Sequence, residues 1–314
     1  MGIDYRLAKA ILHEHKYRPI VGTILLVGRQ TIILTPEEAI NLVSEEGVPV
    51  RSKANIEVDL TTYGSAERSL ITDRSFFSLF SDAEVLALDV SDYENAEIIH
   101  DLNQPIPEEL KGLADFMFNG SCMDNLFDPA SALKNMSHLL RSGGRILHIE
   151  HGSPVQGAYL MYSPAYFFDY YAVNEFVDCK VYACMFEKVL DAWSVFLWEP
   201  YFLRDGRWAL SNHMHPGWPN ILNFVIAEKG PASTCDKTPI QGFYREAHGA
   251  KEDLYLKAFE AYLTSKRPIM QLTKAADVGA EQYLTTVWIL IRGHFGRSND
   301  EKTGRLTCTN RHCA

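Results

Sequence analysis

Short, largely apolar runs recur along the first half of the chain, and turn residues or polar segments separate them. A run of this kind is typical of a strand in a parallel sheet that is covered on both faces. The sequence therefore predicts five consecutive strands: "GTILLVG" (22–28), "EVLALDV" (84–90), "AEIIHDL" (96–102), "ADFMFNG" (114–120) and "RILHIEH" (145–151).

Amphipathic segments lie between these runs. In "TPEEAINLVSEEG" (35–47), Thr35 can cap a helix that starts at Pro36, and Glu38 completes a capping box. Gly47 is suited to end that helix. Two further helices are predicted in this half of the chain: "SFFSLF" (75–80) and residues 129–140.

Strands that alternate with helices predict an α/β fold, a Rossmann-like, doubly wound and mostly parallel sheet with right-handed crossovers. Ligands of such sheets bind beyond the carboxyl ends of the strands, beside the switch in strand order. The candidate ligand-binding residues therefore come directly after five positions near the strand ends: Val27, Leu88, His100, Phe118 and Ile149.

After residue 151 the chain predicts an aromatic helix over 166–176. Three strands then complete a sheet of about seven, the last two of them antiparallel at one edge: "CKVYACMFE" (179–187), "AWSVFLWEPYF" (192–202) and "NILNFVIAEKG" (220–230). Residues 1–232 are expected to form the Rossmann-like domain, with inserted segments after 151. Residues 233–314 are expected to form a helical C-terminal extension and a polar tail. Its amphipathic helices offer a surface through which copies of the chain could form a homo-oligomer.

Charge and composition exclude some classes of function. The formal net charge of -10 lacks the basic excess with which most nucleic-acid binders neutralise phosphates, so no nucleic-acid partner is expected. No apolar run is long enough for a membrane span, and the first residues read as an amphipathic helix rather than a signal peptide. These observations favour a cytoplasmic protein with reduced thiols.

The stretch "ADFMFNGSCMDNLFDPASALKNMSHLLRSGGRILHIEH" carries a family resemblance. It is similar to the fourth and fifth strands of class I S-adenosylmethionine-dependent methyltransferases, which run as strand, loop, "xDPxxAL" helix, "LLxxGGR" and strand. The resemblance covers residues 20–230 and implies S-adenosylmethionine as the cofactor. Gly143 and Gly144 are then expected to turn the chain from helix to strand, with at least one of them at positive φ.

The resemblance also assigns residues to the nucleoside. Asp89 is expected to accept hydrogen bonds from the ribose hydroxyls, with Val90 beside it. Asp101 is expected to accept from the adenine amino group, and the Leu102 backbone N–H to meet a ring nitrogen. Each of these residues lies at the end of a predicted strand, where a polar residue can also begin a turn.

The loop after the first strand departs from the family pattern, which has an acid followed by Gly-x-Gly. Here Gly28 is followed by Arg29 and Gln30. We expect Arg29 to bind the carboxylate of the methionine moiety, since a guanidinium can fork onto a carboxylate. In the alternative, Arg29 pairs with a protein carboxylate such as Glu37 or Glu38, and side chains fill the cavity.

Further candidates follow the fourth and fifth strands. Asn119, Gly120 and Ser121 are expected to line the floor of the cofactor pocket, although Asn-Gly is also an ordinary turn pair. His151 is the candidate general base, because imidazole has a suitable pKa. His148 lies inside the strand and is expected to be packed and hydrogen-bonded in the core.

No metal site is predicted. His213 and His215 form a loop H-x-H without a nearby third ligand, and the terminal "CTNRHC" has no partner motif. Several aromatic residues could shape an acceptor pocket, although helical spacing places most of them in the core: Tyr159, Tyr162, Tyr166, Phe167, Phe168, Tyr170 and Tyr171.

The sequence thus favours methyl transfer from S-adenosylmethionine to an oxygen of a small molecule, such as a sugar or glycan precursor. Two alternatives stay open. The chain could be a methyltransferase-shaped binding or scaffold protein that has lost the cofactor, or it could use the nucleoside pocket for other chemistry.

Overall fold

The computed structural model describes residues 2–62, 65–186, 193–198, 200, 220–241 and 252–267. The chain divides into two compact units, Met1–Leu272 and Thr273–Ala314, and the described residues all lie in the first. The predicted division at residue 232 remains a prediction. Of the predicted C-terminal helices, only the first lies within the described residues.

The core of the first unit is an eight-stranded sheet with the order β3-β2-β1-β4-β5-β8-β6-β7. The five predicted strands are confirmed, and they pair in parallel from β3 to β5. The sheet has one strand more than the seven expected. The strands are β1 (Thr23–Val27), β2 (Glu84–Asp89), β3 (Ile98–Ile99), β4 (Ala114–Gly120), β5 (Leu140–His151), β6 (Asp178–Phe186), β7 (Ser194–Leu197) and β8 (Asn220–Glu228).

The order 3-2-1-4-5 is that of the doubly wound Rossmann sheet, so the predicted fold class is confirmed. The far side of the sheet is mixed. Strand β8 lies between β5 and β6 and is antiparallel to both, and β7 is antiparallel to β6 at the edge. The switch in strand order falls between β1 and β4, so the fold places a ligand crevice beyond their carboxyl ends.

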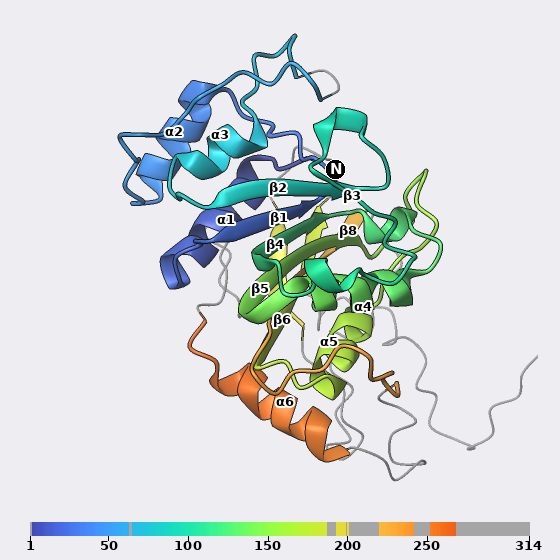
Figure 1. Ribbon diagram of the computed structural model, residues 1–314. Coiled ribbons are helices and arrows are strands. Elements are labelled where there is room, and N and C mark those ends of the chain that lie inside the picture. The colour runs from blue at the N-terminus through green and yellow to red at the C-terminus, as the bar shows by residue number, and fades with distance from the viewer. Residues whose placement is uncertain are drawn as a thin grey trace, which may run out of the picture. The chain divides into compact units, whose positions relative to one another are not determined.

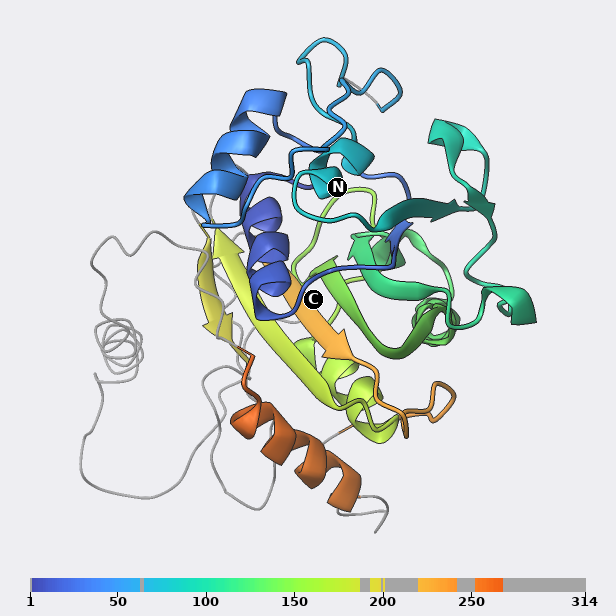
Figure 2. The same cartoon turned by 60° about the vertical axis from the view of Figure 1, so that its left-hand side comes forward.

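Helices cover both faces of this sheet (Figures 1 and 2). One core contains the buried faces of α1, α2 and α3, and the other those of α4, α5 and α6. Strand β1 contributes to both, because Ile24 and Leu26 point to the first core while Leu25 and Val27 point to the second. The helices are α1 (Tyr5–Tyr17), α2 (Pro36–Glu45), α3 (Asp73–Ser78), α4 (Pro129–Leu139), α5 (Pro164–Val173) and α6 (Glu252–Thr264).

Local sequence explains the start of α2. The Thr35 side chain accepts from the Glu38 N–H, and the Glu38 carboxylate accepts from the Thr35 N–H at 2.8 Å, so the predicted capping box is confirmed. Gly47 follows the helix with a φ of 70°. Helix α2 therefore has the ends that its sequence predicts.

The glycine pair after α4 lies elsewhere than predicted. Helix α4 ends at Leu139, and Gly143 and Gly144 belong to β5, which already begins at Leu140. Gly143 has the expected positive φ, 82°, and the pairing of β4 with β5 shifts register at this point. The glycines thus accommodate an irregularity within the strand, rather than the turn that leads into it.

A buried ionic cluster joins distant parts of the chain beside β5. Glu14 of α1 pairs with Arg145 of β5 at 2.5 Å and also with Arg267, which follows α6. Arg267 further donates to Asp178 at 2.8 Å and to Glu228 at 3.2 Å. The first helix and the segment after α6 are therefore held together through charged side chains.

Candidate functional site at the strand ends

The switch point places the ends of β1, β2 and β4 side by side. Val27 is in register with Leu88 of β2 and with Asn119 of β4. Gly28, the next residue of the chain, therefore lies beside the ends of both strands. Gly28 has a φ of 72°, and its N–H donates to the Leu88 carbonyl at 2.8 Å. This conformation favours glycine, and the backbone is open there, because the nearest atom to an added Cβ would be Asp89 Oδ2 at 3.8 Å.

Arg29 points away from this opening and is paired within the protein. Its guanidinium contacts Asp73 at 3.3 Å and Glu97 at 2.7 Å, and it donates to the carbonyls of Glu94 and Asn95. Burial opposes the charge, but the two carboxylates raise the pKa of Arg29 above its usual value. The protein-carboxylate alternative is therefore the one seen, although with partners other than those expected, Glu37 and Glu38.

The side chain of Gln30 folds back over the strand ends. Its Nε2 donates to the carbonyls of Val27 and Gly28, each at 3.1 Å, and the residue is buried. A Cβ atom on Gly120 would lie 2.4 Å from Gln30 Oε1, and that oxygen has no partner among the described residues. Gln30 thus occupies space beside Gly120, where the family pattern would have a glycine.

Asp89 is half-buried at the end of β2 and is the carboxylate nearest the open backbone of Gly28. Its Oδ1 accepts from the Ser91 N–H at 3.3 Å, so it also begins a turn, while Oδ2 faces the Gly28 side. Val90 is 68% exposed beside it. These positions are consistent with a ligand that approaches from the solvent side of the loop.

Asp101 and Leu102 follow β3. Asp101 Oδ1 accepts from the Asn103 N–H at 2.9 Å and from Asn103 Nδ2 at 2.7 Å, so this carboxylate is engaged in its own turn. Leu102 is buried, and its carbonyl accepts from Asn135. Their contacts with an adenine remain predictions.

Asn119 does not lie on an open pocket floor. It is buried, and its Nδ2 donates to Glu150 Oε1 at 2.6 Å and lies 2.9 Å from His148 Nδ1. His148 Nε2 lies 2.6 Å from the Tyr171 hydroxyl, and burial lowers the pKa of His148 to about 3, so the ring is neutral. The prediction of a core histidine is confirmed.

Glu150 is a buried acid that sequence reasoning overlooked. It accepts from the Met123 and Asp124 N–H groups, each at 3.2 Å, besides Asn119. Burial, and secondly the nearby carboxylate of Asp124, raise the pKa of Glu150 well above its usual range. The side chain therefore favours its neutral form.

His151, the predicted base, contacts a second overlooked acid. Its Nδ1 makes a short contact with Asp124 Oδ2 and lies 3.0 Å from the Ser121 hydroxyl, which also donates to Asp124. The Asp124 side chain is 1% exposed and that of His151 is 19% exposed. A carboxylate at Nδ1 favours the tautomer whose Nε2 carries a lone pair, which is the arrangement of an oriented general base.

Other candidates fall into the core or outside the described residues. Burial raises the pKa of the Cys122 thiol to about 12, so it is not a nucleophile at neutral pH. Most of the aromatic candidates are buried, as predicted: Tyr162, Phe167, Phe168, Tyr170 and Tyr171. The described residues contain no group of three or more metal-ligating side chains, and His213 and His215 lie outside them.

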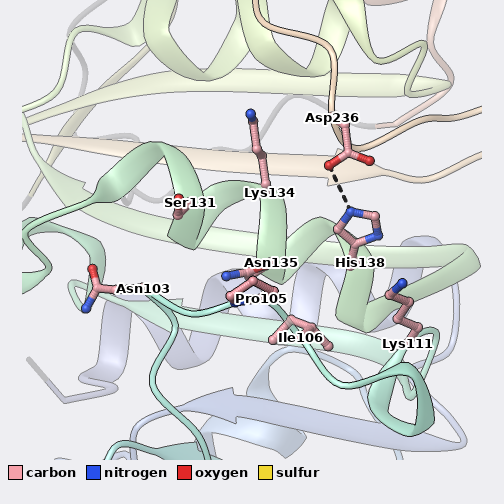
Figure 3. Close-up of a pocket in the computed structure, with 9 residues that line it drawn as sticks. All are labelled: Asn103, Pro105, Ile106, Lys111, Ser131, Lys134, Asn135, His138 and Asp236. Atoms are coloured by element: carbon pink, nitrogen blue, oxygen red, sulfur yellow. Dashed lines mark hydrogen bonds and ion pairs between the residues drawn. The ribbon is translucent and has the colours of Figure 1, made fainter.

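A pocket of about 310 Å³ lies on another part of the unit, between α4 and the loop after β3 (Figure 3). Lys111, Lys134 and His138 line it, and His138 is bonded to Asp236 at 3.1 Å. Asn103, which is hydrogen-bonded to Asp101, also lines this pocket. None of the predicted cofactor-binding residues is among those that line this pocket.

Within the described part of the chain, no helix is both long and apolar enough to cross a membrane. No family model matches the chain, and no curated protein matches it.

Solved structures do match, at low identity. The methyltransferase domain of a citrinin polyketide synthase is 12% identical over 72% of this chain, with a TM-score of 0.36. This chain spans about half of that one, 52% of its length. A Burkholderia thailandensis 1,6-didemethyltoxoflavin N1-methyltransferase with bound S-adenosylhomocysteine is 12% identical, with 72% of this chain and 78% of that one covered and a TM-score of 0.34.

A Thermotoga maritima protein described as a SAM-dependent methyltransferase is 15% identical, with 72% of this chain and 90% of that one covered and a TM-score of 0.34. These structures are described as members of the group that the sequence motif resembles. Their likenesses carry no argument about the reaction of this chain, and its Rossmann-like fold rests on its own strand order.

Proposed function

We propose that the chain transfers a methyl group from S-adenosylmethionine to a hydroxyl oxygen of a small molecule, with His151 as the general base. The observation that carries this proposal is the pairing of His151 Nδ1 with the buried carboxylate of Asp124 at the carboxyl end of the sheet. In such a pair the carboxylate orients the imidazole ring and stabilises the protonated ring that forms when the base accepts a proton.

The residues at the switch point fit the nucleoside part of this cofactor. The backbone of Gly28 is open, and Asp89 Oδ2 faces the same side, so Asp89 would accept from the ribose hydroxyls. Asp101 would accept from the adenine amino group once its bonds to Asn103 are shared. These residues would suit the nucleoside better than the amino-acid end, which would meet the side chain of Gln30.

When bound, the cofactor supplies an electrophilic methyl group on a sulfonium. His151 Nε2 would take the proton of the acceptor hydroxyl as the new O–CH₃ bond forms and the C–S bond breaks, which leaves a neutral thioether. Asp124 would stabilise the imidazolium that results. General-base catalysis of this kind contributes about 10²- to 10⁴-fold to a rate.

Calorimetric titration with S-adenosylmethionine and S-adenosylhomocysteine tests cofactor binding. Asp89→Ala should weaken binding by about 1.5 to 3 kcal/mol, the range for hydrogen bonds to a charged group, or about 10- to 160-fold. Asp92→Ala, an exposed acid of the same loop, is the matched control and should bind as the wild type does. Equal affinity of Asp89→Ala and wild type would reject the ribose assignment.

The base is tested by the release of S-adenosylhomocysteine with a panel of hydroxyl compounds. His151→Gln should lower the rate of methyl transfer by about 10²- to 10⁴-fold and leave the Kd of the cofactor unchanged. A variant with full activity would remove His151 from the reaction.

A second function is favoured by the first loop. Arg29 is already ion-paired, and Gln30 fills space beside Gly120, as would suit a binding or scaffold protein without the cofactor. Failure of the wild-type protein to bind S-adenosylmethionine at millimolar concentration would support that function over the enzyme.

A further inference from the structure

An exposed apolar surface lies next to His151. Phe127, between β4 and α4, is 85% exposed, and three residues of the loop between β5 and α5 contribute the rest: Tyr159 (70%), Leu160 (36%) and Met161 (52%). We call these four residues the rim. Single exposed apolar side chains are ordinary on a protein surface, but Phe127 and Tyr159 contact each other, and clustered ones mark a binding surface.

The rim is bonded directly to the pair of His151 and Asp124. The N–H groups of Tyr159 and Leu160 donate to the Asp124 carbonyl, at 2.7 and 3.2 Å, and that of Tyr162 donates to the His151 carbonyl at 2.8 Å. The loop part of the rim, residues 159–161, is therefore fixed relative to the proposed base, since its backbone is held on both sides.

The two exposed rings of the rim contact each other. The centroids of Phe127 and Tyr159 lie 6.2 Å apart at an interplanar angle of 84°, an edge-to-face pair. Both rings are exposed, and a third ring can stack on or against such a pair.

Two of the polar side chains beside the base are already engaged, while Asp124 Oδ1 is buried without a partner among the described residues. Asn119 is bonded to Glu150, and Ser121 is bonded to Asp124 and His151. A sugar carries many hydroxyls that need partners, and these side chains offer it few. An acceptor with one reactive hydroxyl and an apolar body matches the surface better.

Charge narrows the acceptor further. The carboxylate of Asp124 lies against the base, and the chain has a net charge of -10. An anionic acceptor would be repelled on approach. The four side chains of the rim are uncharged, so they do not offset this repulsion.

We propose that the rim binds the ring of a neutral hydroxylated aromatic compound and presents its hydroxyl to His151. This proposal rests on the proposed function for the reaction, but the binding surface exists without the cofactor. It replaces the sugar or glycan acceptor that the sequence favours with an acceptor of aromatic chemistry.

Binding of 2-naphthol to the protein without cofactor tests the surface, by calorimetry or by the fluorescence of the naphthol. The matched ligands are 2-naphthoate, which has the same rings with a negative charge, and methyl glucoside, which has hydroxyls without an aromatic ring. We expect 2-naphthol to bind at least about tenfold more tightly than either.

Phe127→Ala and Tyr159→Ser should each weaken 2-naphthol binding by about tenfold, because an aromatic anchor is removed. Both side chains are exposed, so neither change should impair folding. Leu263→Ala, which removes a 60% exposed apolar side chain on α6, is the control and should have no effect. Binding that is insensitive to both rim variants, or tighter binding of the glucoside or the naphthoate, would overturn the proposal.

The two proposals fail separately. Rim-dependent binding of 2-naphthol without any binding of S-adenosylmethionine supports the surface and overturns the proposed function. Binding of S-adenosylmethionine without binding of 2-naphthol supports the proposed function and overturns the aromatic surface. Self-association of the wild type that Phe127→Ala abolishes would show that a second copy occupies the rim, and would also overturn the inference.

Discussion

The side-chain amide of Gln30 lies against Gly120, the last residue of β4, so closely that a Cβ atom there would stand 2.4 Å from Gln30 Oε1. The Gln30 side chain thereby fills the space beside the end of β4, while the backbone of Gly28 in the same loop stays open. A cofactor whose amino-acid end enters this space has to displace the Gln30 amide.

Gln30→Gly should therefore open the strand ends. We expect the Kd of S-adenosylmethionine to fall at least about fivefold, because the ligand no longer has to displace the amide. The free energy of unfolding should fall by about 1 to 2 kcal/mol, since two hydrogen bonds to the carbonyls of Val27 and Gly28 are lost. Gln30→Met keeps the volume of the side chain and is the control. A cofactor affinity in Gln30→Gly equal to that in Gln30→Met would show that the side chain is no obstacle.

Arg29 should matter for stability. Arg29→Met leaves the buried carboxylate of Asp73 without its guanidinium partner, and we expect a loss of about 3 to 5 kcal/mol in the free energy of unfolding. Arg74→Met removes another partner of Glu97, but Arg74 is 58% exposed, so the loss should stay below about 1 kcal/mol. Urea denaturation of the two variants measures the difference, and similar losses would contradict the buried pairing.

Glu150 should make stability depend on pH. Its pKa is raised in the folded protein, so the unfolded chain ionises first, and the free energy of unfolding falls as pH rises above the usual carboxyl value of about 4.5. The fall is at most about 1.4 kcal/mol per pH unit and stops at the raised pKa. The Glu150→Gln side chain cannot ionise, so the free energy of unfolding of this variant should lose this dependence on pH. A constant change in stability caused by the substitution itself does not affect the comparison. Denaturation at pH 5, 6.5 and 8 compares the slopes, and parallel curves would show that Glu150 is already ionised.

The glycine pair of β5 should tolerate substitution poorly, for two different reasons. At Gly144 an added Cβ would lie 2.9 Å from the Ala114 carbonyl oxygen, so Gly144→Ala forces backbone apart and should cost about 1 to 3 kcal/mol. At Gly143 there is room, but the φ of 82° strains Gly143→Ala by about 1 to 2 kcal/mol. Thermal unfolding measures both. A neutral Gly144→Ala would mean that the β4–β5 irregularity relaxes freely.

The fold could be predicted to a large extent because burial on both faces leaves apolar runs that are visible in the sequence. The capping box of α2 lies within four consecutive residues, so the sequence alone could also predict it. Strand β7 was expected within residues 192–202, and the structure places it at Ser194–Leu197, because an aromatic stretch does not mark where a strand begins and ends. The position of Gly143 and Gly144 was wrong because a glycine pair after a helix looks the same whether it ends the helix or bends the next strand.

The candidate site was less predictable. Asp124 and His151 are 27 residues apart, one after β4 and the other at the end of β5, so no local spacing links them. The partners of Arg29 lie 44 and 68 residues away, in α3 and beside β3. Position at a strand end was sufficient to select His151 and Asp89, whereas the choice of partner depends on tertiary packing that local patterns do not encode.

The ionic cluster around Glu14 can be completed only late in the synthesis of the chain. Arg145 becomes available to Glu14 once β5 has been made, but the second partner, Arg267, follows 253 residues after Glu14. Until that residue has left the ribosome, only one of the two carboxylate oxygens of Glu14 has its partner, and a ribosome-bound chain that stops before α6 should expose α1 to proteases that the finished protein resists.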